Sequence, residues 1–164
     1  MEKIKKVSLS IIIFCFVLFN SCKKDEEPVY FKATIKSYGF DFSTGKAETS
    51  EWTNSDGRTT LWQPGSGNNP DYPNNNYIWW MNSHIENYSN QTKNLGEIDI
   101  TTVKSVNKNW DTVPDIIPLL KGHVYVVKCR DGYVKFKVLS TKTTVMSSPV
   151  EIEYYFSSTE KFEE

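Results

Sequence analysis

One cysteine near the start of the chain carries the most specific chemistry in the sequence. Cys22 closely follows an apolar run, Val7 to Phe19, and three lysines precede that run within the first six residues. This order is typical of a signal peptide, and the run is too short to cross a bilayer core of about 30 Å. The stretch Leu18-Phe19-Asn20-Ser21-Cys22 resembles a bacterial lipobox, in which the cysteine thiol is diacylglycerylated and the peptide is cut before it. We therefore expect residues 1–21 to be removed and Cys22 to carry the lipid.

The residues after Cys22 predict where the anchor places the protein. Residues 22–28 form a short tether of mixed charge, and Lys24 followed by Asp25 and Glu26 resembles the export signal of surface-exposed lipoproteins. A plain solvated tether is the alternative. Several acyl chains hold a protein at a membrane without spanning it. We expect an outer-membrane protein that is anchored by lipid and exposed at the cell surface.

The mature chain is weakly acidic and of single-domain size. Loss of the leader leaves 16 basic and 19 acidic residues, a net charge of −3, which argues against a nucleic-acid partner. Residues 29–164 fit one domain. With Cys22 lipidated, Cys129 has no disulfide partner in the mature chain, and its place in an apolar strand predicts a buried, unreactive thiol. No pattern indicates the oligomeric state.

The common catalytic motifs are missing from the sequence. It contains no HExxH pair, no GxSxG elbow, no phosphate-binding loop and no CxxC. Local motifs do not exclude a pair of catalytic carboxylates that only the fold brings together. We expect a binding protein and not an enzyme.

The stretch Gly122–Ser140 predicts the hairpin around which the domain is built. Asp131-Gly132 between two β-rich runs favours a two-residue type I′ turn, which requires positive φ. Pairing outward from that turn places the apolar residues on one face, which we expect to face the core. The expected pairs are Cys129 with Val134, Val127 with Phe136 and Tyr125 with Val138. The opposite face, expected to be a cationic surface open to solvent, carries Lys128, Lys135 and Lys137.

The rest of the chain predicts short strands separated by turns. Together with the hairpin they indicate an all-β fold: a single antiparallel domain of meander and hairpin type with little helix. The expected strands are 29–42 with a bend at Gly39, 59–62, 77–81, 97–106 and 151–156. Irregular segments are expected at 63–76, which is rich in Asn and Pro, and at 111–121, where two prolines prevent a helix. A helical turn at 83–86 is an alternative to loop.

Three of these features together resemble a known family. The lipobox, the segment Phe40–Lys46 with Trp52 downstream, and the hairpin segment Val124–Val138 are similar to the HmuY-like family of Bacteroidetes surface lipoproteins. The resemblance implies an all-β fold with an apolar cleft. It also implies a haemophore-like role, in which haem is captured and passed to an outer-membrane receptor.

Haem bound in this way would need axial ligands to its iron. Imidazole and thioether groups fill that role, and the candidates in this chain are His84, His123, Met81 and Met146. Both histidines lie at the edges of expected strands. An ordinary surface role remains the alternative for each of them.

The aromatic residues support a second interpretation. Trp79 and Trp80 lie in one expected strand, and Trp62 precedes the Asn-rich loop. Rings beside amide groups suit glycan or protein binding with no haem role, whereas packing in the core is the structural alternative.

One further motif concerns modification. Asp111-Thr112-Val113 resembles the acceptor pattern for O-glycosylation in Bacteroidetes, which makes Thr112 a candidate acceptor. A polar start to the proline-containing segment is the alternative.

Overall fold

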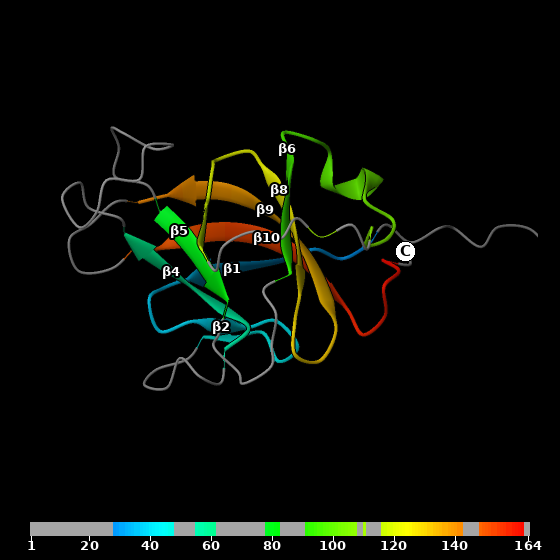
Figure 1. The fold of residues 1–164 in the computed structure, drawn as a ribbon, viewed down its shortest axis with the longest axis horizontal. Coiled ribbons are helices and arrows are strands. Elements are labelled where there is room, and N and C mark those ends of the chain that lie inside the picture. The colour runs from blue at the N-terminus through cyan, green and yellow to red at the C-terminus, as the bar shows by residue number, and fades with distance from the viewer. Residues whose placement is uncertain are drawn as a thin grey trace, which may run out of the picture.

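The described part of the chain forms two antiparallel sheets of five strands each (Figure 1). The computed structural model describes residues 28–47, 55–61, 78–82, 91–107, 110, 116–142 and 148–162. Sheet A has the order β1-β10-β9-β8-β6, and sheet B the order β3-β2-β4-β5-β7. The strands of sheet A are β1 (Phe31–Ile35), β6 (Thr92–Gly96), β8 (Val124–Lys128), β9 (Tyr133–Thr141) and β10 (Val150–Ser157). Those of sheet B are β2 (Phe40–Asp41), β3 (Lys46–Ala47), β4 (Gly57–Leu61), β5 (Ile78–Asn82) and β7 (Ile116–Pro118).

This architecture confirms the predicted all-β class. Every strand pairing among the described residues is antiparallel, and their helical content is the short 3-10 turn η2 (Ile100–Thr102). Within these ranges no helix has the length and apolar character needed to cross a bilayer.

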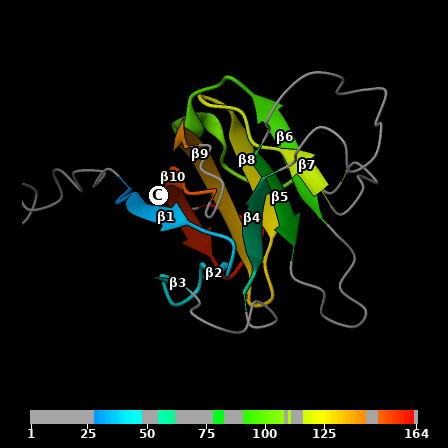
Figure 2. The same ribbon diagram turned by 90° about the vertical axis from the view of Figure 1, so that its left-hand side faces the viewer.

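The two sheets pack against each other through a shared apolar core. In Figure 1, β4 and β5 pass in front of β9 and β10, and Figure 2 places β1 and β3 on one side and β6 and β7 on the other. Phe40 of β2 and Ile117 of β7 pack in the same cluster as the inner face of sheet A. That inner face contributes the buried side chains of Ile35, Tyr125, Val127, Val134, Phe136, Val138, Val150, Ile152 and Tyr154. Burial of this apolar surface is the main stabilising contribution to the fold.

The β8–β9 hairpin has the predicted inner face but a different register. Val127 pairs with Val134 and Tyr125 with Phe136, which shifts the expected pairing by two residues. The predicted two-residue turn is therefore wrong, and the connection is the four-residue loop Cys129–Gly132. A shift of two keeps every side chain on its face, because side chains alternate along a strand, so the apolar face still points into the core.

The glycine of this loop serves a close contact and not a positive φ. Gly132 is not among the glycines with positive φ; a Cβ there would overlap the Ser157 carbonyl oxygen at the end of β10. The Cys129 N–H donates to the Gly132 carbonyl oxygen at 2.7 Å and closes the loop. Cys129 is free and buried, and burial raises the pKa of its thiol well above the usual value, which agrees with the predicted unreactive cysteine.

The face of the hairpin that we expected to be cationic and solvated is largely covered. Lys135 is fully buried, and its Nζ donates to the Val103 carbonyl oxygen at 2.9 Å. Three rings surround the ammonium group, with Nζ 5.3 Å from the ring centroid of Tyr30 and 5.4 Å from those of Tyr155 and Phe162. The hydrogen bond and the cation–π contacts replace water around the charge. The expectation of a solvent-facing lysine surface is wrong at Lys135.

The cover over this face is the segment that we predicted as a strand at 97–106. The strand lies just before it, at β6, and the segment itself turns through η2, where Asp99 Oδ1 accepts from the Thr101 N–H at 2.9 Å. Ile100, Val103 and Val106 then pack on the outer side of β8 in a second cluster. Their apolar spacing reflects contact with a sheet face and not membership of a strand.

The proline-containing segment contributes an edge strand. Within 111–121, residues Ile116–Pro118 form β7, which pairs with β5 at the edge of sheet B. A proline is tolerated there because an edge strand can lack one ladder donor.

The expected bend at Gly39 is present, with φ of 103° between β1 and β2. The expected loop at 63–76 and the helical turn at 83–86 lie outside the described residues.

Candidate ligand-binding site

His123 is held at the entrance to β8 by its own backbone. Its N–H donates to the Leu120 carbonyl oxygen at 3.2 Å, and its carbonyl oxygen accepts from the Val138 N–H at 3.1 Å. His123 has the same strand parity as Tyr125, so its side chain lies on the face of sheet A that meets sheet B. The two rings stack, with centroids 6.5 Å apart and an interplanar angle of 30°. The half-exposed imidazole therefore has a fixed direction.

Asn94 of β6 fixes the tautomer of that imidazole. Asn94 Oδ1 accepts from the Gly96 N–H at 2.8 Å, so the amide is oriented with its oxygen toward both Gly96 and His123. His123 Nδ1 lies 3.1 Å from the same oxygen. An acceptor oxygen requires Nδ1 to be the donor, which leaves Nε2 with its lone pair when the ring is neutral.

This arrangement is the one used by metal-binding histidines. A ligating imidazole usually donates its second ring N–H to an oxygen, which orients the ring and makes the ligating nitrogen more basic. In the part of the chain that the structure describes, Nε2 of His123 has no hydrogen-bond partner. The nitrogen is therefore available to a ligand.

Tyr125 connects this site to sheet B. The Tyr125 hydroxyl donates to the Pro118 carbonyl oxygen at 2.8 Å and accepts from the Leu120 N–H at 2.9 Å. Burial raises the pKa of Tyr125 to about 12, so the phenol stays neutral and keeps both bonds. Trp79 of β5 pairs with Pro118, and Met81 pairs with Ile116. The backbone of Trp79 thus lies nearer to the Tyr125 and His123 end of β7 than that of Met81.

The remaining predicted site residues are only partly described. Trp79, Trp80 and Met81 form part of β5, for which the backbone is described. The side chains of these three residues are outside the description, as are the residues Cys22, Trp62, His84, Thr112 and Met146. All of these assignments stay predictions. Among the described residues, no three His, Cys, Asp or Glu side chains gather into a group that could hold a metal ion.

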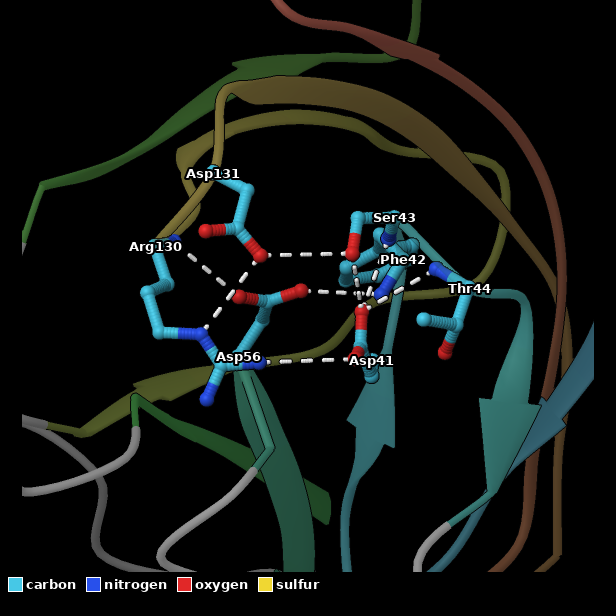
Figure 3. A network of polar contacts seen from close by, with 7 residues as sticks. All are labelled: Asp41, Phe42, Ser43, Thr44, Asp56, Arg130 and Asp131. Atoms are coloured by element: carbon cyan, nitrogen blue, oxygen red, sulfur yellow. Dashed lines mark hydrogen bonds and ion pairs between the residues drawn. The ribbon is translucent and has the colours of Figure 1, made fainter.

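A second polar group, which sequence reasoning missed, joins the tip of the β8–β9 hairpin to sheet B (Figure 3). Asp56 is 2% exposed; its Oδ2 accepts from the Phe42 N–H at 2.8 Å and its Oδ1 from the Arg130 N–H at 3.0 Å. Burial raises the pKa of Asp56, and the hydrogen bonds from Phe42 and Arg130 act against that rise. Both carboxylate oxygens thus bind backbone across the two sheets.

Asp41 organises the turn beside it. Its Oδ1 accepts from the Ser43 hydroxyl at 2.7 Å and from the N–H groups of Ser43 and Thr44 at 2.9 and 3.1 Å. The Arg130 guanidinium lies between two carboxylates: its Nη2 is 3.4 Å from Asp41 Oδ2, and its Nε is 3.5 Å from Asp131 Oδ2. Burial acts to raise the pKa of Asp41, but the hydrogen bonds from Ser43 and Thr44 outweigh it and lower the pKa. This network has the character of a structural junction, since the carboxylate oxygens are occupied by the chain's own donors.

No family model matches the chain, and no curated protein or solved structure matches it significantly.

Asn94 is the residue of the His123 site that sequence reasoning missed. It lies 29 positions away, and its pairing depends on a register shift in β6 between Asn94 and Gly96 that no local pattern indicated.

Proposed function

We propose that this chain is a lipid-anchored outer-membrane protein, exposed at the cell surface, that binds haem through His123 in haem or iron acquisition. The observation that carries the proposal is the imidazole oriented by Asn94, with Nε2 left as the ligating nitrogen. Imidazole nitrogen is a common axial ligand of haem iron. The resemblance to HmuY-like lipoproteins supports the same function.

The chain has side chains of the types that haem needs, both to ligate its iron and to pack against the porphyrin. Haem would supply an iron centre that accepts nitrogen ligands, and His123 Nε2 would be one of the atoms that hold it. Met81, His84 and Met146 are the candidates for a second ligand, and Trp79 and Trp80 for apolar walls against the porphyrin. A lipid on Cys22 would hold the protein at the membrane, where an outer-membrane receptor could accept the haem. The role is binding and delivery and not catalysis.

A hemin titration of the mature protein without its lipid tests this function. We expect a saturable shift of the Soret band, and His123→Ala should change the spectrum more than it weakens binding, because apolar burial of the porphyrin survives the loss of the axial ligand.

Two variants of Asn94 provide the matched control. Asn94→Asp keeps an acceptor oxygen opposite His123 Nδ1 and should retain a spectrum with His123 as ligand, whereas Asn94→Ala frees the ring and should move the spectrum toward that of His123→Ala. The absence of any saturable Soret change, under oxidising or reducing conditions, would contradict haem binding. Glycan or protein binding without haem would then take its place.

A further inference from the structure

A cleft lies on the other side of the molecule, where the edge strand β1 and its neighbour β10 meet the β2–β3 turn. Its volume is about 430 Å³, within the range of small-molecule sites. Its lining includes the aromatic side chains of Phe31, Phe42 and Tyr154 and the turn residues Ser43, Thr44 and Gly45. Apolar and polar groups thus face the same space.

The polar wall of this cleft is held in place before any ligand arrives. Ser43 and Thr44 belong to the turn that Asp41 binds through one carboxylate oxygen. Gly45 completes the turn with φ of 68°, a conformation that side chains other than glycine rarely adopt. The junction in Figure 3 therefore fixes the wall to the hairpin tip.

Tyr154 contributes a hydroxyl to the cleft. The residue is 5% exposed, and its ring packs edge-on against Phe42 with centroids 5.2 Å apart. A Cβ added at Gly45 would lie 3.2 Å from the Tyr154 hydroxyl oxygen, which locates that oxygen at the polar wall. Among the described residues the hydroxyl has no hydrogen-bond partner. The hydroxyl is not among the fully buried, unbonded polar atoms, so it is accessible to a group that enters the cleft.

Phe31 provides an exposed apolar face beside that hydroxyl. Its side chain is 56% exposed, although its ring lies 5.7 Å from that of Tyr154. A large aromatic ring left open to water at the mouth of a cleft offers a flat surface for stacking. Phe31 and the Tyr154 hydroxyl are therefore placed to contact the same small molecule.

We propose that this cleft binds a pyranose sugar residue. A pyranose has an apolar C–H face, which suits the Phe31 ring, and a rim of hydroxyls, which can both donate to and accept from the Tyr154 hydroxyl. The Ser43–Gly45 turn lines the polar side of the same space. The site is separate from His123, since β1 and β8 are not neighbours in sheet A.

Saturation-transfer NMR on the mature protein without its lipid tests the cleft, with the methyl glycosides of glucose, galactose, mannose and N-acetylglucosamine as probes. We expect at least one glycoside to receive saturation. Tyr154→Phe, which removes only the hydroxyl, should weaken its binding by roughly three- to tenfold, the effect of one hydrogen bond. Phe31→Ala should weaken it too.

Tyr133→Phe is the matched control, because it removes a hydroxyl that bonds Glu160 outside the cleft. It should leave the affinity for the glycoside unchanged. Hemin spectra should be the same for Tyr154→Phe and wild type, which separates this cleft from the proposed haem site. The sugar site is overturned if none of the four glycosides receives saturation, or if folded Tyr154→Phe binds as tightly as wild type.

Discussion

Side chains in this molecule acquire their chemistry from partners that are distant in the sequence. His123 has a defined tautomer only because Asn94, on a neighbouring strand, presents an oxygen that is already bonded to Gly96. Asp41 and Asp56 are both buried, yet their pKa values shift in opposite directions. Burial dominates at Asp56, whereas hydrogen bonds from the adjacent turn prevail at Asp41.

The lowered pKa of Asp41 predicts how stability depends on pH. Its folded-state pKa lies below the ordinary value of 3.8, so its contribution is present above that value and is lost as the pH falls through the folded pKa. Asp41→Asn should lower the free energy of unfolding by about 1–3 kcal/mol at pH 7. The difference from wild type should shrink below pH 3.8, as measured by urea unfolding at several pH values.

Asp131→Asn is the control for that series. The Asp131 side chain is 54% exposed and makes only long contacts, 3.4 Å to Ser43 and 3.5 Å to Arg130. Its replacement should change stability by at most about 0.5 kcal/mol at either pH. A difference between wild type and Asp41→Asn that is the same at pH 7 and at pH 3 would show that the carboxylate does not act through its charge.

Some residue environments could be predicted from the sequence, and others depended on the fold. The burial of Cys129 was predicted from the alternating apolar pattern that continues from β8, although the residue itself lies in the loop after that strand. The partners of His123 and Asp56 do not, because Asn94 is 29 residues from the first and Arg130 is 74 residues from the second. Those contacts exist only after the sheets have formed in the observed register.

At the level of elements, the hairpin β8–β9 is covered on both faces. Its inner face meets sheet B, and its outer face meets the segment that contains η2 together with Phe162 near the end of the described chain. Lys135 lies in the second of these contacts with its charge enclosed by rings and the Val103 carbonyl. The lysine thereby holds the segment that contains η2 against the outer face of sheet A.

Truncation of that lysine tests the covered outer face. Lys135→Ala removes a buried aliphatic stem, and we expect it to lower the free energy of unfolding by about 2–5 kcal/mol, as for other large buried side chains. Lys137→Ala, two residues further along β9 and only half-buried, should cost at most about 0.5 kcal/mol. Equal small effects in urea unfolding would mean that the outer face is open, as the sequence first predicted.

The wrong predictions of a strand at 97–106 and of a two-residue hairpin turn each have a physical cause. Residues 97–106 alternate like a strand because they pack on a sheet face, and alternation records burial on one side and not backbone conformation. The Asp131-Gly132 pair indicated the correct hairpin, but Gly132 is required by the nearby Ser157 backbone and not by a type I′ turn. Strand parity was predictable because both registers preserve it.

On the scale of the whole molecule, the two candidate sites lie at opposite sides of the paired sheets. His123 is bonded to β6, whereas the Tyr154 cleft adjoins β1, and Figure 2 places these two strands on opposite sides. The fold class was predictable from turn spacing and alternation, whereas the arrangement of the two sheets was not, because it depends on long-range pairings such as β1 with β10.

The anchor is tested by the location of the protein in cells. Cys22→Ala should release the protein from the membrane fraction, because the proposed acyl chains, at about 0.8 kcal/mol per buried CH₂, would supply the attachment. Immunoblots of membrane and soluble fractions measure this directly. A variant that stays with the membranes as wild type does would show that Cys22 is not the attachment point.

The most direct test of the central claim is a ¹⁵N spectrum of the histidine rings, recorded with and without gallium protoporphyrin, a diamagnetic analogue of haem. His84→Asn identifies the resonances of His123. In the free protein with a neutral ring, we expect His123 Nδ1 to be protonated and bonded to Asn94, and Nε2 to be unprotonated. On addition of the porphyrin, Nε2 should undergo the large shift of a metal-bound nitrogen while Nδ1 stays protonated. A proton on Nε2 in the free protein, or an Nε2 resonance that does not move with the porphyrin, would contradict the account.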